Sequence, residues 1–266
     1  MRLFVLEVNQ PDDKISLAKA NLFFAQTQYP ELNPDIYLNQ LDAIASVLQE
    51  KLPDNSYPLK IIQTINQYLF EELRFTGNTR DYYDPRNSYL NEVLDRKLGI
   101  PISLSILYLE IAQRLNFPMV GIGMPGHFLI RPNFEEAGIF VDAFNQGEIL
   151  FPEDCETRLQ QVYQQPVKLD PAFLAPISNR QILVRMLTNL KFIYVNNNNY
   201  EKALQVINSL LILLPDSETE LRDRGLLYYQ MGDGEHAIVD LETYLKLSPN
   251  AHDAPAIYQL LEQIRG

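Results

Sequence analysis

The 266-residue sequence is poor in cysteine, with Cys155 as its single example. One cysteine excludes an internal disulfide and cannot supply a cysteine-rich zinc site. It is also typical of a protein that works in a reducing compartment. The sequence thus gives no sign of a disulfide framework, a structural metal or a bound cofactor.

Basic residues and long apolar runs are also scarce. Lys and Arg number 22 against 34 Asp and Glu, for a formal net charge of −12. Such a surface repels phosphate, which argues against nucleic acid and favours a basic partner. No apolar segment approaches the roughly 20 residues needed to span a bilayer, and the N-terminal apolar run is too short for a secretory signal. We therefore expect a cytoplasmic protein without a membrane span.

The first hundred residues carry helical signals. Asn33 followed by Pro34 is an N-cap and first-turn pattern, and apolar residues then recur at helical spacing, which predicts a helix over 34–51. A second start signal at Pro58 begins a helix that reaches Leu73. Further helices are predicted over 88–97, ended by Gly99, and over 102–115. The last of these is apolar on most sides and is therefore buried.

Short strands follow the apolar helix. Three segments are punctuated by Pro and Gly and are rich in β-branched or aromatic residues, and Asn145-Gln-Gly147 forms a turn into a fourth. These are residues 117–123, 128–131, 138–142 and 148–151. A helix then restarts at Pro152. The pattern predicts an α+β fold, mostly helical, with a small antiparallel sheet behind a central buried helix.

The last ninety residues contain an internal repeat of 34 residues, the period of the tetratricopeptide repeat. The aligned pairs are Tyr194 with Tyr228, Glu201 with Glu235, Ala203 with Ala237, Ile207 with Leu241, Leu211 with Leu245, and Pro215 with Pro249. Small alanines let antiparallel helices approach closely, and the prolines end the second helix of each unit. We predict a first domain over 1–170 and an all-α repeat domain over 171–266, with units at 182–215 and 216–249 and a capping helix near 254–265.

Ser103, His127 and Asp142 are the candidate catalytic residues. Ser103 stands at the start of the buried helix, where the helix dipole and free backbone N–H groups favour a nucleophile and an oxyanion. His127 opens one strand and Asp142 ends the next, so that neighbouring strands can bring them into hydrogen-bonding reach. A histidine beside apolar residues can equally serve as a structural hydrogen-bond donor. Spacing alone leaves both roles open.

Three blocks of this region carry a family resemblance. They are Gly99-Ile-Pro-Ile-Ser-Leu-Ser, Pro125-Gly-His-Phe-Leu-Ile-Arg and Val141-Asp-Ala-Phe-Asn-Gln-Gly. With the downstream repeats, they resemble the SirB family of transglutaminase-like proteins over nearly the whole chain. The resemblance implies a transglutaminase or papain-like core in which a cysteine opens the central helix, with His127 and Asp142 as the other two catalytic positions.

The cysteine of that pattern is absent, because residues 101–103 contain no thiol and Cys155 follows the aspartate. Loss of the nucleophile favours a non-catalytic interaction or regulatory scaffold that binds a protein or peptide. The alternative is a serine-dependent amide or ester hydrolase or acyltransferase, in which Ser103 attacks and His127 acts as the base. The oligomeric state is left open.

Four other residues are candidates for a ligand or partner cleft. Glu110 lies on the same helical face as Ser103, and Arg131 points to the same side of its strand as His127. Tyr83 and Arg86 belong to a loop that mixes aromatic and charged groups. Each also has a simpler role, as a buried partner, a surface ion pair or a solvated loop residue. His236 and His252 have no second ligand at metal spacing.

Overall fold

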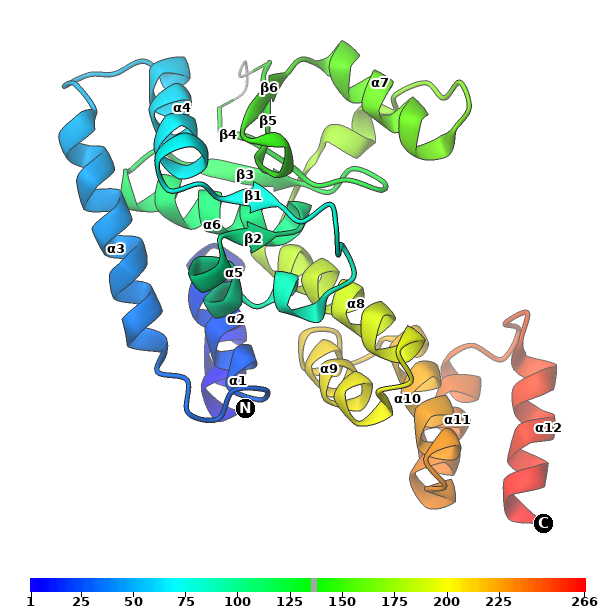
Figure 1. The fold of residues 1–266 in the computed structure, drawn as a ribbon. Helices are drawn as coiled ribbons and strands as arrows, with labels where there is room; N and C mark the ends of the chain where they lie inside the picture. The colour runs from blue at the N-terminus through cyan, green and yellow to red at the C-terminus, as the bar shows by residue number, and fades with distance from the viewer. Residues whose placement is uncertain (135–137) are drawn as a thin grey trace. The chain divides into compact units, whose positions relative to one another are not determined.

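The computed structural model describes residues 1–134 and 138–266 and divides them into two compact units (Figure 1). The units are Met1–Met186 and Leu187–Gly266, so the division falls within helix α8 (Asn179–Asn196). The sequence placed the end of the first domain earlier, at residue 170.

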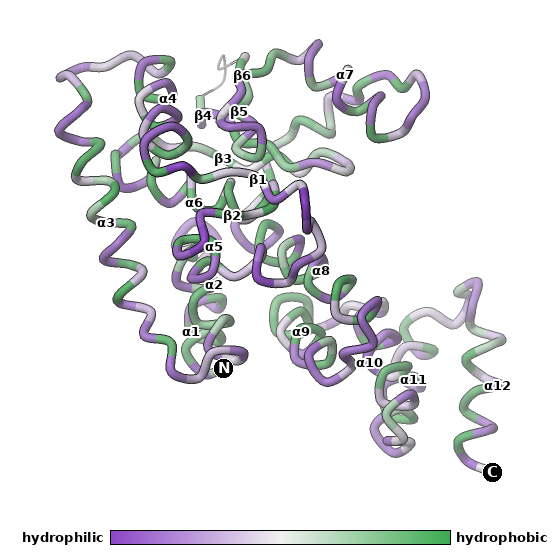
Figure 2. The backbone as a smooth tube through the Cα atoms, in the orientation of Figure 1, coloured by the Kyte–Doolittle hydropathy of each residue, from purple (hydrophilic) through white to green (hydrophobic). Residues whose placement is uncertain are grey.

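The first unit is mainly helical. Its helices before α8 are α1 (Arg2–Val8), α2 (Leu17–Ala25), α3 (Pro34–Lys51), α4 (Pro58–Asn66), α5 (Leu90–Arg96), α6 (Pro101–Arg114) and α7 (Pro152–Tyr163). Short helical turns are η1 (Asp12–Lys14), η2 (Gln67–Glu72), η3 (Pro85–Ser88), η4 (Ala143–Asn145) and η5 (Pro171–Leu174). The predicted helix over 34–51 is confirmed, and the Asn33 side chain accepts a hydrogen bond from the Asp35 N–H. Figure 2 shows the alternation of apolar and polar residues along α3.

The helix predicted from Pro58 reaches Glu72 but changes type along its length, and the predicted end of the next helix was wrong. The α-helix that starts at Pro58 ends at Asn66 and continues as the π-helical turn η2. Helix α5 ends at Arg96, where Lys97 adopts a left-handed conformation with φ of 60°. Gly99 instead belongs to β2 (Leu98–Gly99), which pairs in parallel with β1 (Thr76–Gly77).

The predicted small antiparallel sheet is confirmed. Its strands are β3 (Met119–Ile122), β4 (Leu129–Pro132), β5 (Phe140–Asp142), β6 (Glu148–Leu150) and β7 (Pro176–Ile177), in the spatial order β6-β5-β4-β3-β7. Helix α6 packs against β3 and β4, and every residue from Pro101 to Ala112 is buried. The α+β fold with a central buried helix is therefore confirmed, and it brings the ends of β4 and β5 into one region.

The second unit begins within α8 and adds α9 (Tyr200–Leu213), α10 (Glu218–Gln230), α11 (Gly234–Leu247) and α12 (Ala254–Arg265). Ala203 and Ala237 are fully buried, as the repeat alignment requires. Gly225 adds a third close approach, because a Cβ there would lie 2.7 Å from Leu241 Cγ. The helix boundaries and the small residues together confirm the tetratricopeptide-like arrangement of this unit.

Candidate functional site

His127 ends a tight turn that begins at Met124. The His127 N–H donates to the Met124 carbonyl at 3.2 Å, and Gly126 has φ of +71°. Proline followed by glycine at the two central positions is the pattern of a type II turn. A Cβ at Gly126 would also lie 2.3 Å from Val162 Cγ1. The Pro-Gly dipeptide therefore sets the direction in which the chain presents His127.

Asp142 ends β5 and caps the turn η4. One carboxylate oxygen accepts hydrogen bonds from the backbone N–H groups of Phe144 and Asn145, and the other accepts from the Asn145 side-chain amide at 2.8 Å. The second oxygen also lies 2.7 Å from His127 Nε2. Asp142 is fully buried. The sequence prediction that strand pairing brings His127 and Asp142 together is confirmed.

The environment of Asp142 favours its ionised form. Burial acts to raise the pKa of this carboxyl, but the hydrogen bonds and charge from His127 and the bonds from Asn145 outweigh it and hold the pKa below the ordinary value. An ionised carboxylate only accepts hydrogen bonds, so the His127 Nε2 carries the shared proton. The other ring nitrogen, Nδ1, is then available as an acceptor or, when the ring is protonated, as a donor.

A row of three aromatic rings begins beside the imidazole. The Phe144 ring meets the His127 ring edge to face at 6.4 Å between centroids, and Tyr82 packs on Phe144 in the same manner at 6.0 Å. Tyr83, which is 61% exposed, packs on Tyr82. Burial raises the pKa of the Tyr82 hydroxyl, so it stays protonated and able to donate. The histidine thus lies in a mostly apolar setting with polar groups at its edge.

Ser103 is held by other contacts. Its Oγ donates to the Asn87 carbonyl at 2.5 Å and accepts from the Ile100 N–H at 3.0 Å, and its side chain is fully buried. The Asn87 amide in turn donates to the carbonyls of Asp81 and Tyr82. Ser103 therefore caps α6 and fixes the loop that carries Tyr82. Nothing in this geometry supports the serine-dependent hydrolase.

Replacing Ser103 with alanine is expected to destabilise the first unit by about 1–3 kcal/mol, because the buried Asn87 carbonyl and Ile100 N–H lose their partner. Urea unfolding measures this free energy. Ser46, which is exposed and donates only to the Asp42 carbonyl of its own helix, supplies the matched control, and Ser46→Ala should change stability by less than about 0.5 kcal/mol. Equal effects of the two changes would contradict the role assigned to Ser103.

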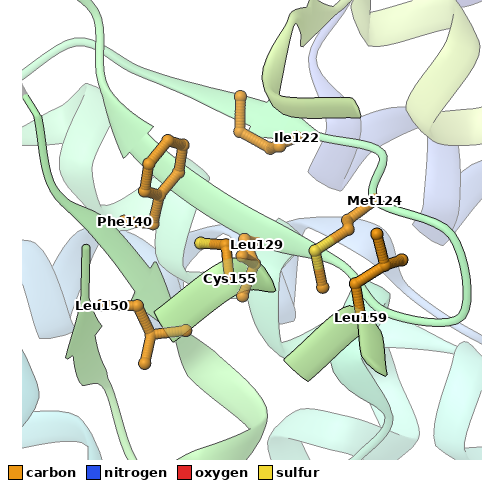
Figure 3. Packing of buried hydrophobic residues seen from close by; sticks show 7 residues of the cluster. All are labelled: Ile122, Met124, Leu129, Phe140, Leu150, Cys155 and Leu159. Carbon is orange, nitrogen blue, oxygen red and sulfur yellow. The ribbon is translucent and has the colours of Figure 1, made fainter. Parts of the chain in front are cut away.

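Cys155 is a packing residue (Figure 3). It is fully buried in a cluster with Ile122, Met124, Leu129, Phe140, Leu150 and Leu159. Burial raises the pKa of its thiol to about 11, with a further contribution from Asp154. The thiolate is the reactive form of cysteine. This thiol is therefore protonated near neutral pH and enclosed by apolar side chains.

The other predicted cleft residues have separate surroundings. Glu110 is 3% exposed and binds Ser16, the Ala18 N–H and Arg114. Arg131 donates to the carbonyls of Pro132 and Phe134, and Arg86 forms a bidentate pair with the buried Asp84. Of the four candidates, Tyr83 packs its ring on Tyr82, which in turn contacts Phe144 beside His127.

Two cavities occur away from His127. One of about 300 Å³ lies between α6 and β3 and includes Asp12, Glu110, Gln113 and Asn133 in its lining. The other, of about 340 Å³, belongs to the second unit and is mainly apolar; α8, α9 and α10 line it with Thr188, Lys191, Phe192, Val195, Ile207, Asp223, Leu226 and Leu227. Lys191 is neutralised by Glu220 and Asp223 at its edge. We call the second cavity the repeat groove.

Within residues 1–134 and 138–266, no group of three or more His, Cys, Asp or Glu side chains is placed to hold a metal ion. Over that same part of the chain, each helix is too short or too polar to cross a bilayer.

Three residues of the site were not recognised from the sequence. Asn145 was interpreted only as a turn residue, although its position three residues after Asp142 is a local signal for a capping contact. Arg158 lies 3.7 Å from Asp142 and 2.5 Å from Glu148. Arg185 donates to the carbonyls of Met124 and His127 at 2.8 and 2.6 Å. No local pattern marks Arg185, because its partners are about sixty residues away in the chain.

Comparison with known proteins agrees with this architecture. A family model described as the transglutaminase-like superfamily matches residues 35–188, and one described as a tetratricopeptide repeat matches residues 190–262. A UPF0162 protein of Xylella fastidiosa (strain 9a5c) is 38% identical over 250 residues, which cover 92% of this chain and 89% of that protein.

Two further relatives match part of the chain. A UPF0162 protein of Vibrio cholerae is 34% identical over 182 residues, or 68% of this chain and 67% of that protein. F-box only protein 21 of Homo sapiens is 30% identical over 184 residues, or 65% of this chain but only 28% of that longer protein. The chain therefore belongs to the SirB-like UPF0162 family of the transglutaminase-like superfamily, with tetratricopeptide repeats after its transglutaminase-like domain.

Proposed function

We propose that the chain is a non-catalytic interaction protein, in which the transglutaminase-like domain binds a ligand or peptide at His127 and the repeats hold a protein partner. The main support for this proposal is the position of the Ser103 hydroxyl and the Cys155 thiol, the two side chains considered as nucleophiles. The Ser103 hydroxyl is bonded to Asn87, and the Cys155 thiol is protonated inside an apolar cluster. In the described residues, no hydrogen bond joins a serine, threonine or cysteine to His127.

The His127–Asp142 pair has a use in such a protein. Asp142 fixes the orientation of the imidazole, and Asn145 and the backbone of η4 fix Asp142. A histidine held in this way presents one ring nitrogen in a constant direction to a bound molecule. The surrounding Tyr82, Tyr83 and Phe144 rings add apolar contact area.

The repeat groove supports a protein partner. Stacked helix pairs form extended surfaces suited to peptides and partner helices. One face of α8 lines the groove with Thr188, Lys191, Phe192 and Val195. On α10, the Leu226 side chain is 36% exposed. The net charge of −12 favours a basic partner. We therefore propose a cytoplasmic partner whose binding segment combines apolar side chains with basic flanking residues.

Charged substitutions in the repeat groove are expected to weaken partner binding at least about tenfold, because Val195→Glu or Leu226→Glu buries an unpaired carboxylate at the contact. The measurement is capture from native cytosol by the tagged full-length chain, followed by titration of the captured protein. Val239→Glu on α11 is the matched control, because Val239 is 62% exposed and does not line the groove. Unchanged binding by both groove variants would overturn the partner assignment.

The non-catalytic part of the proposal has its own test. The full-length chain should show no turnover of amide or ester substrates above a His127→Ala variant. A hydrolytic or acyl-transfer activity that disappears with His127→Ala, at an unchanged melting temperature, would overturn it. His236→Ala, in the second unit, is the control for a nonspecific effect of losing a histidine.

A further inference from the structure

Arg185 carries a charge that no carboxylate neutralises in the described residues. Its Nη2 is bonded to the carbonyls of Met124 and His127, and its guanidinium lies over the Phe128 ring at 5.5 Å. Within residues 1–134 and 138–266, it forms no ion pair within 4 Å, whereas Arg86, Arg96, Arg114 and Arg158 each do. Burial acts on it strongly enough to lower the pKa of its guanidinium. A half-buried cation without a counterion is costly unless a ligand supplies one.

Arg185 also lies next to the group of side chains that contact His127. The His127 ring contacts Phe144, Phe144 contacts Tyr82, and the charge of Arg185 acts on the Tyr82 hydroxyl. Arg185 itself is joined to His127 by the 2.6 Å bond from its Nη2 to the His127 carbonyl. Tyr82 is thus linked to His127 through Phe144, and Arg185 is bonded directly to the His127 backbone.

These groups have the donors that an anion needs. With Nη2 committed to two carbonyls, the guanidinium keeps its Nε and Nη1 hydrogens. Tyr82 keeps its hydroxyl proton, and His127 Nδ1 becomes a donor when the ring is protonated. Planar guanidinium groups bind planar carboxylates through paired, charge-assisted hydrogen bonds.

We propose that Arg185, with Tyr82 and His127, forms a recognition site for a single carboxylate. This site is the ligand site at His127 proposed above. The inference rests on that proposed function in one respect, that the bound molecule is held and not chemically converted. A carboxylate fits better than a phosphate because Arg185, which forms no ion pair in the described residues, matches one negative charge, and Asp142 beside His127 repels a dianion more strongly than a monoanion. The carboxylate can belong to a peptide C-terminus or to a small free acid.

Histidine ring signals offer a direct test, because the full-length chain contains three histidines. Protein labelled with carbon-13 histidine is titrated with acetyl-Ala-Ala-Ala bearing a free C-terminus, with its C-terminal amide, and with sodium acetate at matched ionic strength. The free acid should shift the His127 signal saturably and leave the His236 and His252 signals unchanged, whereas the amide should not shift His127. An equal response to acetate identifies a small acid as sufficient, and a response to the peptide alone identifies a chain terminus.

Variants assign the effect to Arg185. Arg185→Gln keeps a donor for the Met124 and His127 carbonyls and removes the charge, so it should weaken binding of the free acid at least about tenfold. Arg185→Lys keeps the charge without the planar fork and should bind with intermediate affinity. Arg131→Gln is the matched control, because Arg131 also donates to two backbone carbonyls and should bind like wild type.

Two results would contradict the assignment of a carboxylate ligand to Arg185. Equal shifts by acid and amide, or wild-type affinity in Arg185→Gln, would remove the carboxylate assignment. If Arg185→Gln fails to fold, Arg185→Lys with the acid and amide pair decides the question. The repeat groove variants lie outside this site, so failure of the carboxylate test leaves the test of partner binding unaffected.

Discussion

Asp142→Ala is expected to destabilise the first unit by about 3–5 kcal/mol. Asp142 is fully buried, and alanine removes the acceptor for His127, for the Asn145 amide and for the two N–H groups that begin η4. Those donors would then be buried without partners or would rearrange. Denaturant unfolding, followed by a probe in the first unit, measures the loss.

The control is Glu148→Ala at the end of the same strand pair, where the side chain is half exposed and pairs only with Arg158 in the described structure. Its effect should stay within about 1 kcal/mol. If Asp142→Ala were no worse than Glu148→Ala, the hydrogen bonds of Asp142 would have little value in the folded protein, and the positioning of His127 would need another explanation.

Asp142 also makes the stability of the first unit depend on pH in the acid range. The pKa of Asp142 lies below its unfolded value of 3.8 in the folded chain, so the folded state favours the ionised form. Its contribution to stability is complete above the unfolded pKa and is lost as the pH falls through the folded pKa. The difference in unfolding free energy between wild type and Asp142→Asn should therefore be constant near neutral pH and shrink below about pH 4.

Local sequence signals predicted much of the fold. Asn33 and Pro34 fix the start of α3 through contacts within one turn, and the unbroken apolar run after Pro101 marks the buried helix. The turn before β4 that carries His127 and the end of β5 at Asp142 were also predictable, because proline, glycine and β-branched residues punctuate short strands. These features depend on neighbours within a few residues.

The features that the sequence did not predict depend on contacts between residues far apart in the chain. The two-residue strand β7 exists only because Ile177 pairs with Gly121. The Ser103 hydroxyl was predicted at the correct helix start, but its bond to Asn87 follows from the path of a loop that the sequence pattern does not specify. Arg185 was missed for the same reason. The sequence pattern thus predicted the contact between His127 and Asp142 but not the partners of Ser103, which depend on contacts made across the fold.

The position of Glu110 explains why a charged residue occurs within the buried helix α6. Its Oε1 accepts from Ser16 Oγ at 3.1 Å and from the Ala18 N–H at 2.8 Å, at the start of α2. Its Oε2 binds Arg114 at 2.6 Å, one turn further along α6. Glu110 therefore joins α2 to α6, and the carboxylate complements the positive end of the α2 dipole.

Glu110→Ala is expected to lower the free energy of unfolding by about 3–5 kcal/mol. The Glu110 side chain is 3% exposed, and its loss leaves the Ala18 N–H, the Ser16 hydroxyl and the Arg114 guanidinium without this acceptor. Glu110→Gln preserves an acceptor for α2 and should cost less, about 1.5–3 kcal/mol. Asp42→Ala removes the other, exposed partner of Arg114 and should cost under about 1 kcal/mol. The histidine ring signal of His127 should respond to the carboxylate probe in Glu110→Gln as in wild type. A loss of that response at nearly unchanged stability would instead place Glu110 in the ligand site, where the sequence pattern first suggested it.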